Sequence, residues 1–226
     1  IEKSDDTVLD PACGSGTILT AAYKRKLELF KKEGKTGDPH KKFVEEQIFG
    51  IDIMPFAVHL TTANLAAMNP EITIEQAQIV REDSLKLSPY DYVDAGVYQL
   101  KLFTEPAYAY KRTGEQEKIE LRRVKVVLMN PPFTKVERGI SKYIDLSRFR
   151  EICGGEVGLW GHFLALAGVF LEKGGILGTI IPINFLRGRE SRKIREFIFK
   201  NWTPMYILKP TYNYGFTEWA EYRDII

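Results

Sequence analysis

The chain has 226 residues, of which 44% are hydrophobic and 27% are charged, the composition of an ordinary globular protein. This balance excludes a disordered, collagen-like or coiled-coil chain. The longest stretches without Lys, Arg, Asp or Glu cover 53–70, 157–171 and 174–186, all shorter than the roughly 20 apolar residues that cross a bilayer. We therefore expect no membrane span.

Two cysteines, Cys13 and Cys153, without a CxxC pair and with only three histidines, cannot supply a structural zinc site unaided. We expect no metal and a reducing, cytoplasmic location. The net charge of +2 neither requires nor excludes a polyanionic partner. Basic residues gather locally over 134–150 and 187–200. Such runs are more often solvated faces than binding sites.

Short β-rich runs alternate with longer helical patterns along the chain. The expected strands cover 7–9, 47–51, 72–80, 124–129, 176–181, 206–208 and 223–226, the last cut off by the chain end. The expected helices run from about 15 to 30, 55 to 68, 157 to 171 and 189 to 199. This order predicts an α/β, Rossmann-like fold: a seven-stranded, mostly parallel sheet with helices on both faces and ligands at the carboxyl ends of its strands.

The turn after the first strand reads Asp10-Pro11-Ala12-Cys13-Gly14-Ser15-Gly16. Two glycines two apart allow a sharp turn and a close approach to a ligand at a helix N-terminus. An ordinary strand-to-helix turn without a ligand can have the same pattern. Leu19 replaces the third glycine of the dinucleotide fingerprint. The Asp10 carboxylate would also repel a pyrophosphate, which favours a zwitterionic or cationic ligand.

The sequence DPACGSG resembles the cofactor loop of S-adenosylmethionine-dependent amino-methyltransferases, above all the adenine-N6 DNA methyltransferases. Residues 50–58, GIDIMPFAV, resemble the second-strand motif, whose acid binds the ribose hydroxyls, and residues 82–85, EDSL, resemble the third-strand motif, whose acid receives the adenine amino group. Two apolar positions of the helix at 157–171 match the family's adenine pocket, although such spacing is more usual in a core. The resemblance implies that S-adenosyl-L-methionine is bound by Asp10, Pro11, Ala12, Gly14, Gly16, Asp52, Ile53, Asp83, Ser84, Leu159 and Phe163.

Asn130-Pro131-Pro132-Phe133 follows the apolar run 126–129 and matches the catalytic tetrapeptide of the same family. An adenine amine is a poor nucleophile because its lone pair is delocalised into the ring. If the Asn130 side-chain oxygen and the Pro131 carbonyl accept its two N–H protons, the lone pair can point at a sulfonium methyl group. The proline rings hold these carbonyls rigidly. This is orientation and electrostatic preorganisation, so we expect no catalytic histidine.

A base within a duplex must be flipped out to reach such a site, and stacking on aromatic rings stabilises the flipped base. Phe133 would supply one face. Tyr214-Gly215-Phe216 resembles a late family motif, which makes Phe216 a candidate for the other face, although an aromatic there is as often core. The basic run 134–150 follows the tetrapeptide and could contact the flanking phosphates.

Almost the whole chain carries the resemblance, so we expect one methyltransferase catalytic domain over 1–226, with an insertion at about 86–123. The first residues are neither a methionine start nor a signal peptide, which indicates part of a longer protein. We expect DNA as substrate, in a restriction-modification system, with target recognition in a domain or specificity subunit outside this chain. The alternatives are an RNA guanine-N2 methyltransferase, a protein-glutamine methyltransferase and a non-catalytic cofactor-binding subunit.

Overall fold

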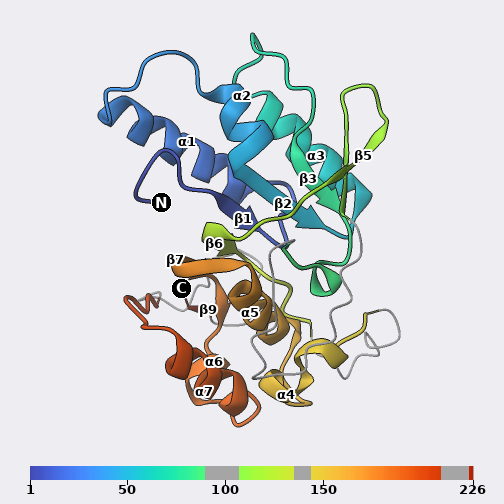
Figure 1. Cartoon of the computed structure of the whole chain (residues 1–226). Coiled ribbons are helices and arrows are strands. Elements are labelled where there is room, and N and C mark those ends of the chain that lie inside the picture. The colour runs from blue at the N-terminus through green and yellow to red at the C-terminus, as the bar shows by residue number, and fades with distance from the viewer. Residues whose placement is uncertain (90–106, 135–143, 210–223, 226) are drawn as a thin grey trace.

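The computed structural model describes residues 1–89, 107–134, 144–209 and 224–225. Its main feature is a seven-stranded sheet in the order β5-β4-β3-β2-β1-β6-β7 (Figure 1). Neighbouring strands pair in parallel from β3 to β7, and the two strands at the other edge pair antiparallel. The strands are β1 (Val8–Asp10), β2 (Ile48–Asp52), β3 (Gln78–Arg81), β4 (Ala107–Tyr110), β5 (Gln116–Ile119), β6 (Val124–Met129) and β7 (Leu171–Thr179).

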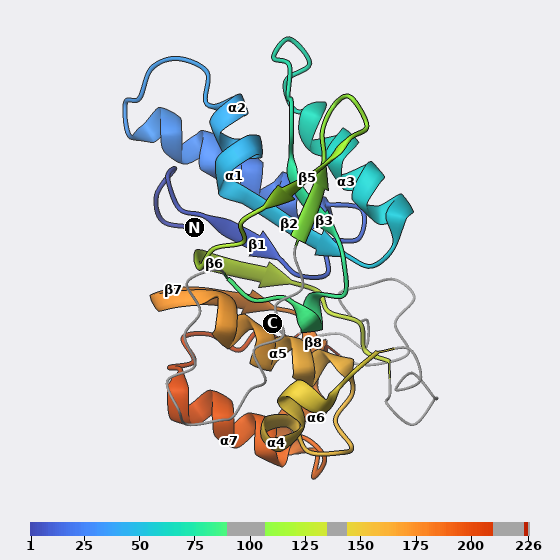
Figure 2. The same cartoon turned by 45° about the vertical axis from the view of Figure 1, so that its right-hand side comes forward.

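Helices cover both faces of the sheet (Figure 2). One face carries α1 (Thr17–Lys32), α2 (His40–Lys42), the π-helical turn η1 (Phe43–Gln47) and α3 (Pro55–Ala66). The opposite side of the molecule carries α4 (Arg150–Cys153), α5 (Leu159–Phe170), α6 (Asn184–Arg187) and α7 (Arg192–Asn201), together with the 3-10 turns η2 (Ser84–Lys86) and η5 (Ser147–Phe149). None of the helices in the described ranges combines the length and the apolar character needed to cross a membrane.

Successive strand residues alternate between two hydrophobic cores, because side chains of a strand point to opposite faces of the sheet. Val8, Ile48, Ile79 and Val126 pack with residues of α1, η1 and α3. Their neighbours Leu9, Phe49, Val80 and Val127 belong to one core with the apolar side chains of α5. Strands that are apolar on both faces are typical of parallel sheets covered by helices, which is the predicted arrangement. The fold class is confirmed.

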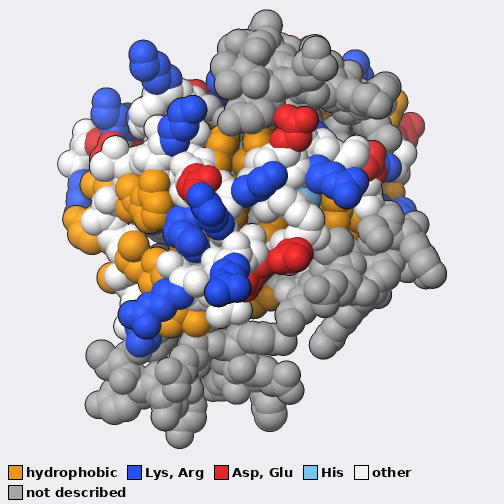
Figure 3. Space-filling view, turned by 90° about the horizontal axis from the view of Figure 1, so that it is seen from below, with side chains coloured by type: hydrophobic (Ala, Val, Ile, Leu, Met, Phe, Trp, Pro, Cys, Tyr) orange, Lys and Arg blue, Asp and Glu red, His pale blue; other side chains and the backbone are white. Residues whose placement is uncertain are grey.

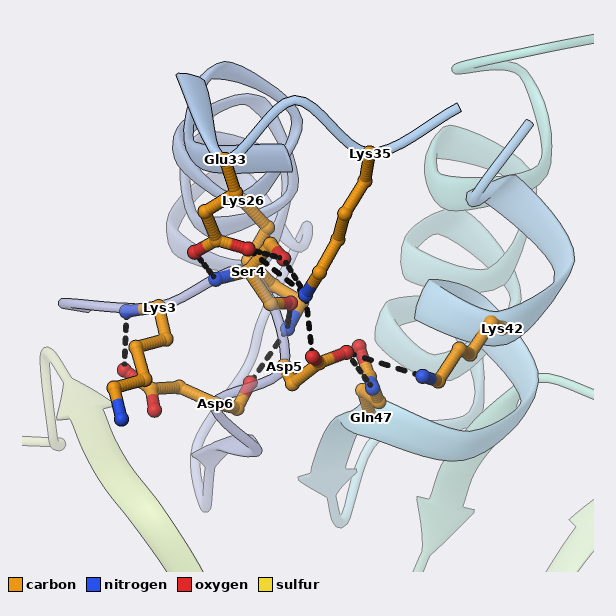
Figure 4. Close-up of polar contacts among 9 residues, drawn as sticks. All are labelled: Lys3, Ser4, Asp5, Asp6, Lys26, Glu33, Lys35, Lys42 and Gln47. Atoms are coloured by element: carbon orange, nitrogen blue, oxygen red, sulfur yellow. Dashed lines mark hydrogen bonds and ion pairs between the residues drawn. The ribbon is translucent and has the colours of Figure 1, made fainter. Parts of the chain in front are cut away.

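A buried lysine fixes the chain just before β1 (Figure 4). Lys26 of α1 is fully buried, and its Nζ donates to the Ser4 carbonyl at 2.6 Å and to the Asp6 carbonyl. Burial lowers the pKa of Lys26 to about 8. Lys35 and Lys42 both pair with Asp5, the latter at 3.0 Å. The segment just before β1 is therefore held by Lys26 of α1 and by Lys35 and Lys42, which follow α1 in the chain.

The structure corrects three details of the predicted sheet. The predicted strand 206–208 is not part of any strand in the described structure, and its side chains are exposed. The last predicted strand is reduced to β9 (Asp224–Ile225), which pairs antiparallel with β8 (Ile181–Pro182) in a separate sheet. The insertion at 86–123 instead supplies β4 and β5, which bring the main sheet to seven strands.

The hairpin β4–β5 was missed because its signals are weak. Its first strand alternates small and aromatic residues, with Ala107 and Ala109 buried and Tyr108 exposed. Alanine is a poor strand former, and charged residues surround the turn at Gly114, so the period of two does not stand out. By contrast, the exposed Tyr206-Ile207-Leu208 has a strong strand composition without a strand partner in the described structure.

Candidate active site

The polar residues of the predicted motifs meet at one edge of the sheet. Asp10 ends β1, Asp52 ends β2, Asp83 follows β3 and Asn130 follows β6. The four strands are consecutive neighbours in the order β3-β2-β1-β6 and run parallel, so their carboxyl ends lie at the same edge. Ligands of open α/β sheets bind at this edge, which makes it the candidate active site.

The two glycines of the first turn have different functions. Both have a positive φ, 53° at Gly14 and 78° at Gly16, which L side chains rarely adopt. A Cβ atom at Gly16 would lie 2.9 Å from side-chain atoms of Thr61, whereas a Cβ atom at Gly14 would have nothing within 4 Å. Gly16 therefore allows α1 and α3 to pack closely, and Gly14 leaves open space beside the turn.

Side chains from α3 and β2 hold this turn in place. Thr61 donates to the Gly14 carbonyl at 2.8 Å, and Asn64 donates to the Ser15 carbonyl at 2.9 Å. The Asp52 carboxylate accepts from the N–H of Gly14 at 2.9 Å and from that of Met54 at 2.8 Å. The sequence analysis did not find these contacts. Thr61 and Asn64 are two of four polar residues in α3, so the sequence does not mark them as contacts of the turn.

Asp10 is a buried acid with one unused oxygen. Its side chain is 1% exposed, and Oδ1 accepts from the Ala12 N–H at 3.0 Å. No hydrogen-bond partner for Oδ2 exists within the described part of the chain. Burial, helped by the negative charge of Asp52, raises the pKa of Asp10 to about 7. Such an oxygen is suited to accept a proton donor from a ligand.

The third-strand motif is joined directly to the first turn. Asp83 is 8% exposed, and its Oδ1 accepts from the Leu85 N–H at 3.1 Å. The hydroxyl of Ser84 donates to the Pro11 carbonyl. The carboxylate that follows β3 is thus held at a fixed place relative to the turn after β1.

The tetrapeptide after β6 alternates between exposed and buried residues. Asn130 and Pro132 are exposed, Pro131 is buried, and Phe133 is half-buried against the core that contains α5. The next residue, Thr134, accepts from the Leu159 N–H at 3.0 Å, which ties the loop to the start of α5. The loop therefore presents the Asn130 side chain outward from a fixed backbone.

The remaining predicted residues occupy different environments. Leu159 and Phe163 are buried in the core, at 3% and 8% exposure, and Pro11 and Ala12 are buried and half-buried. Ile53 is 52% exposed, beside Asp52. The predicted stacking residue Phe216 lies outside the described residues. Contact of these residues with a ligand stays a prediction.

The residues at this edge fit S-adenosyl-L-methionine on three counts. The free oxygen of Asp10 can accept from its ammonium or hydroxyl groups. The space beside Gly14 admits a ligand close to the backbone, and the exposed Ile53 offers an apolar surface beside Asp52. Such a ligand carries a sulfonium, an ammonium and one carboxylate but no phosphate. Its site therefore does not require the cluster of Lys or Arg side chains that a phosphate ligand favours.

The fold is that of the class I S-adenosylmethionine-dependent methyltransferases. A protein so described from Listeria monocytogenes aligns with a TM-score of 0.55 at 17% identity, covering 100% of this chain and 53% of that chain. Within this class, the chain belongs to the Eco57I restriction-modification methylase family, whose model matches residues 46–214.

Two curated relatives are adenine-specific methyltransferases. BrxX of Escherichia coli O9:H4 (strain HS) is 44% identical over 62 residues, which cover 27% of this chain and 5% of that protein. PglX of Streptomyces coelicolor (strain ATCC BAA-471 / A3(2) / M145) is 26% identical over 222 residues, which cover 85% of this chain and 18% of that protein. The chain thus spans less than a fifth of the length of either relative.

Proposed function

We propose that residues 1–226 form the catalytic domain of a DNA adenine-N6 methyltransferase of the restriction-modification type, with S-adenosyl-L-methionine as methyl donor. The observation that carries this proposal is the meeting of Asp10, Asp52, Asp83 and Asn130 at the carboxyl ends of four adjacent parallel strands. Membership of the restriction-modification methylase family and similarity to two adenine-specific methyltransferases support it.

The cofactor would be held by three carboxylates and the glycine turn. Asp10 offers its unused oxygen to a donor of the cofactor, Asp52 accepts from the ribose hydroxyls, and Asp83 accepts from the adenine amine. Asp52 also accepts from the Gly14 N–H, so it shapes the turn while it binds. The bound cofactor supplies an electrophilic methyl group on a sulfonium.

The substrate amine would be oriented by the tetrapeptide after β6. The Asn130 side-chain oxygen and the Pro131 carbonyl accept the two amine protons, which turns the nitrogen lone pair away from the adenine ring. Buried Pro131 and the anchor of Thr134 on α5 keep these acceptors in place without rearrangement. Preorganised acceptors of this kind lower the barrier because no reorganisation is needed as charge develops.

A basic surface on α4, α6 and α7 supports DNA as the partner. Figure 3 shows Lys and Arg side chains gathered on this side of the molecule, with fewer acidic ones. The exposed members of this surface are Arg150, Arg187, Arg189, Arg192, Lys193 and Lys200. Phosphate contacts of this kind give affinity that falls steeply with salt but carries no sequence information. We therefore place sequence choice in a target-recognition region or specificity subunit other than these residues.

Arg148 is an exception to the predicted basic run. The sequence makes the run 134–150 a candidate for phosphate contacts, but the Arg148 guanidinium donates to the carbonyls of Leu85 and Leu87. Lys135, Arg138 and Lys142 of the same run lie outside the described residues.

Calorimetry with S-adenosylhomocysteine, the demethylated product, tests cofactor binding. We expect the 226-residue chain to bind it, and Asp52→Asn to weaken binding about tenfold or more, because charge-assisted hydrogen bonds are lost. Asp38→Asn is the matched control, since Asp38 also accepts from the N–H two residues on, at 2.8 Å, but lies away from the site. Absence of binding at millimolar ligand by the folded chain would contradict the proposal.

Phe133 provides a second test, directed at the flipped base. Phe133→Leu keeps most of the packing against the α5 core but removes the aromatic face, and we expect kcat/KM for DNA to fall roughly fivefold to a hundredfold. Phe133→Tyr keeps the ring and should stay within about threefold of the wild type. The KM for S-adenosylmethionine should not change in either variant. Equal activity of the Leu and Tyr variants would exclude stacking.

A further inference from the structure

Arg148 fastens the segment that follows Asp83. Its Nη1 donates to the carbonyls of Leu85 at 2.9 Å and Leu87 at 2.6 Å, and its Nη2 donates to the Ser88 hydroxyl. The guanidinium also lies over the Phe149 ring, 4.9 Å from the ring centroid. One side chain from η5 thus holds three acceptors of the segment after β3.

The same short segment positions the Asp83 carboxylate. The Leu85 N–H donates to Asp83 Oδ1 at 3.1 Å, while the Leu85 carbonyl accepts from Arg148. Further along, the Leu87 N–H donates to the Ser84 carbonyl at 3.1 Å, and Ser84 donates to Pro11. Any shift of Leu85 therefore moves a hydrogen bond of the acid itself. Arg148 reaches this segment from the region after the tetrapeptide.

We propose that Arg148 is a positioning residue for recognition of the cofactor's adenine ring, acting through Asp83. This inference rests on the proposed function, because it takes Asp83 as the acceptor for the adenine amine. The planar guanidinium reaches the two carbonyls from one nitrogen and the hydroxyl from a second nitrogen at a fixed distance from the first. A lysine at this position would present a single nitrogen and could not hold the three acceptors in the same geometry.

The sequence alone indicated a different role for this residue. Arg148 belongs to a basic run, and such arginines are candidates for phosphate contacts. Its hydrogen bonds to two carbonyls and a hydroxyl of a segment about 60 residues earlier appear only in the structure.

The proposal is tested with two ligands that differ in the protonation of purine N1 and in the group at purine position 6, the position proposed to face Asp83. S-adenosylhomocysteine carries an amine there, and S-inosylhomocysteine carries a carbonyl oxygen that cannot donate. The affinity ratio of the two ligands, measured by calorimetry on the 226-residue chain, reports the adenine preference. We expect Arg148→Gln to reduce this preference roughly threefold to tenfold by weakening only the adenosyl ligand, since one hydrogen bond loses its geometry.

Arg195 supplies the matched control. Its Nη1 also donates to two backbone carbonyls, of Phe185 in α6 at 2.6 Å and of Gly188 in the loop before α7 at 3.2 Å. Arg195→Gln should remove a comparable set of hydrogen bonds to the backbone and leave the affinity ratio of the two ligands unchanged. Amide hydrogen exchange gives a ligand-free readout, and we expect faster exchange at Leu85 in Arg148→Gln but not in Arg195→Gln. Arg148→Lys should behave like Arg148→Gln.

The outcomes separate this proposal from the proposed function. A wild-type chain that prefers the adenosyl ligand, together with an unchanged preference in Arg148→Gln, would overturn the role of Arg148 alone. An equal loss of affinity for both ligands in Arg148→Gln would mean that Arg148 supports the structure of the site in general, and would overturn its role in adenine recognition. A folded wild-type chain that binds neither ligand would overturn the proposed function, and this inference with it.

Discussion

We expect replacement of Asn130 by Ala to lower the rate of methyl transfer at saturating substrates on the order of a hundredfold or more. The reason is the loss of the side-chain acceptor that orients the substrate amine, on a backbone that Pro131 and the Thr134–Leu159 contact keep in place. Asn130 is exposed and ends no helix, so the free energy of unfolding should change little. Single-turnover assays with labelled cofactor, combined with thermal unfolding, measure both quantities.

Two further variants sharpen this prediction. Asn130→Asp keeps an oxygen acceptor in the same place and should retain more activity than Asn130→Ala. Asn184→Ala changes another exposed asparagine, in α6, and should stay within about twofold of the wild type. A parallel loss of cofactor affinity and rate in Asn130→Ala would instead indicate that the residue supports the structure of the site.

We expect replacement of Asp10 by Asn to weaken cofactor binding about tenfold to a hundredfold and at the same time to stabilise the ligand-free chain at alkaline pH. Binding weakens because the unused, buried oxygen is the acceptor offered to the cofactor. Stability rises because burial raises the pKa of Asp10 to about 7, so the folded state resists ionisation that the unfolded state undergoes near pH 4. Affinity of the wild type should also increase from pH 6 to pH 8, as Asp10 becomes ionised.

The pH dependence of stability follows from this raised pKa. Between about pH 4 and pH 7 the folded chain holds a proton that the unfolded chain has lost, so the contribution of Asp10 falls as pH rises and is fully lost above pH 7. Asparagine cannot ionise, so the stability advantage of Asp10→Asn should grow by roughly 2 to 3 kcal/mol from pH 5 to pH 8.

Urea titrations at both pH values measure this difference. Glu28→Gln is the control, because Glu28 is exposed and makes a surface ion pair at 3.3 Å, and it should show no such trend. If the difference in the free energy of unfolding between Asp10→Asn and the wild type is the same at both pH values, folding does not raise the pKa of Asp10.

The parallel part of the fold could be predicted because its strands are apolar on both faces and end at recognisable turns. The run 124–129 and the strand before Asp52 agree with the structure within a residue or two. The hairpin β4–β5 could not be predicted, because buried alanines in a charged surrounding give little periodic signal. For 206–208 the composition favours a strand, but a strand also needs a partner, which local sequence does not reveal.

The candidate site was predictable where chemistry coincides with a strand end. Asp10, Asp52, Asp83 and Asn130 each stand at such a point, and the topology brings them to one edge. The supporting contacts were not predictable, because they join distant segments: Asp52 to Gly14, Ser84 to Pro11, and Arg148 to Leu85. In the sequence nothing distinguishes these side chains from other polar residues, because their hydrogen-bond partners come close only in the folded chain.

The most direct measurement incubates the protein with S-adenosylmethionine labelled in the methyl group and with DNA, transfer RNA and protein acceptors in parallel. Digestion of the products and chromatography then identify the methylated group. Labelled N6-methyladenine in DNA, lost in Asn130→Ala, is the predicted result. Label found in guanine of RNA or in protein, with none in DNA adenine, would contradict the account.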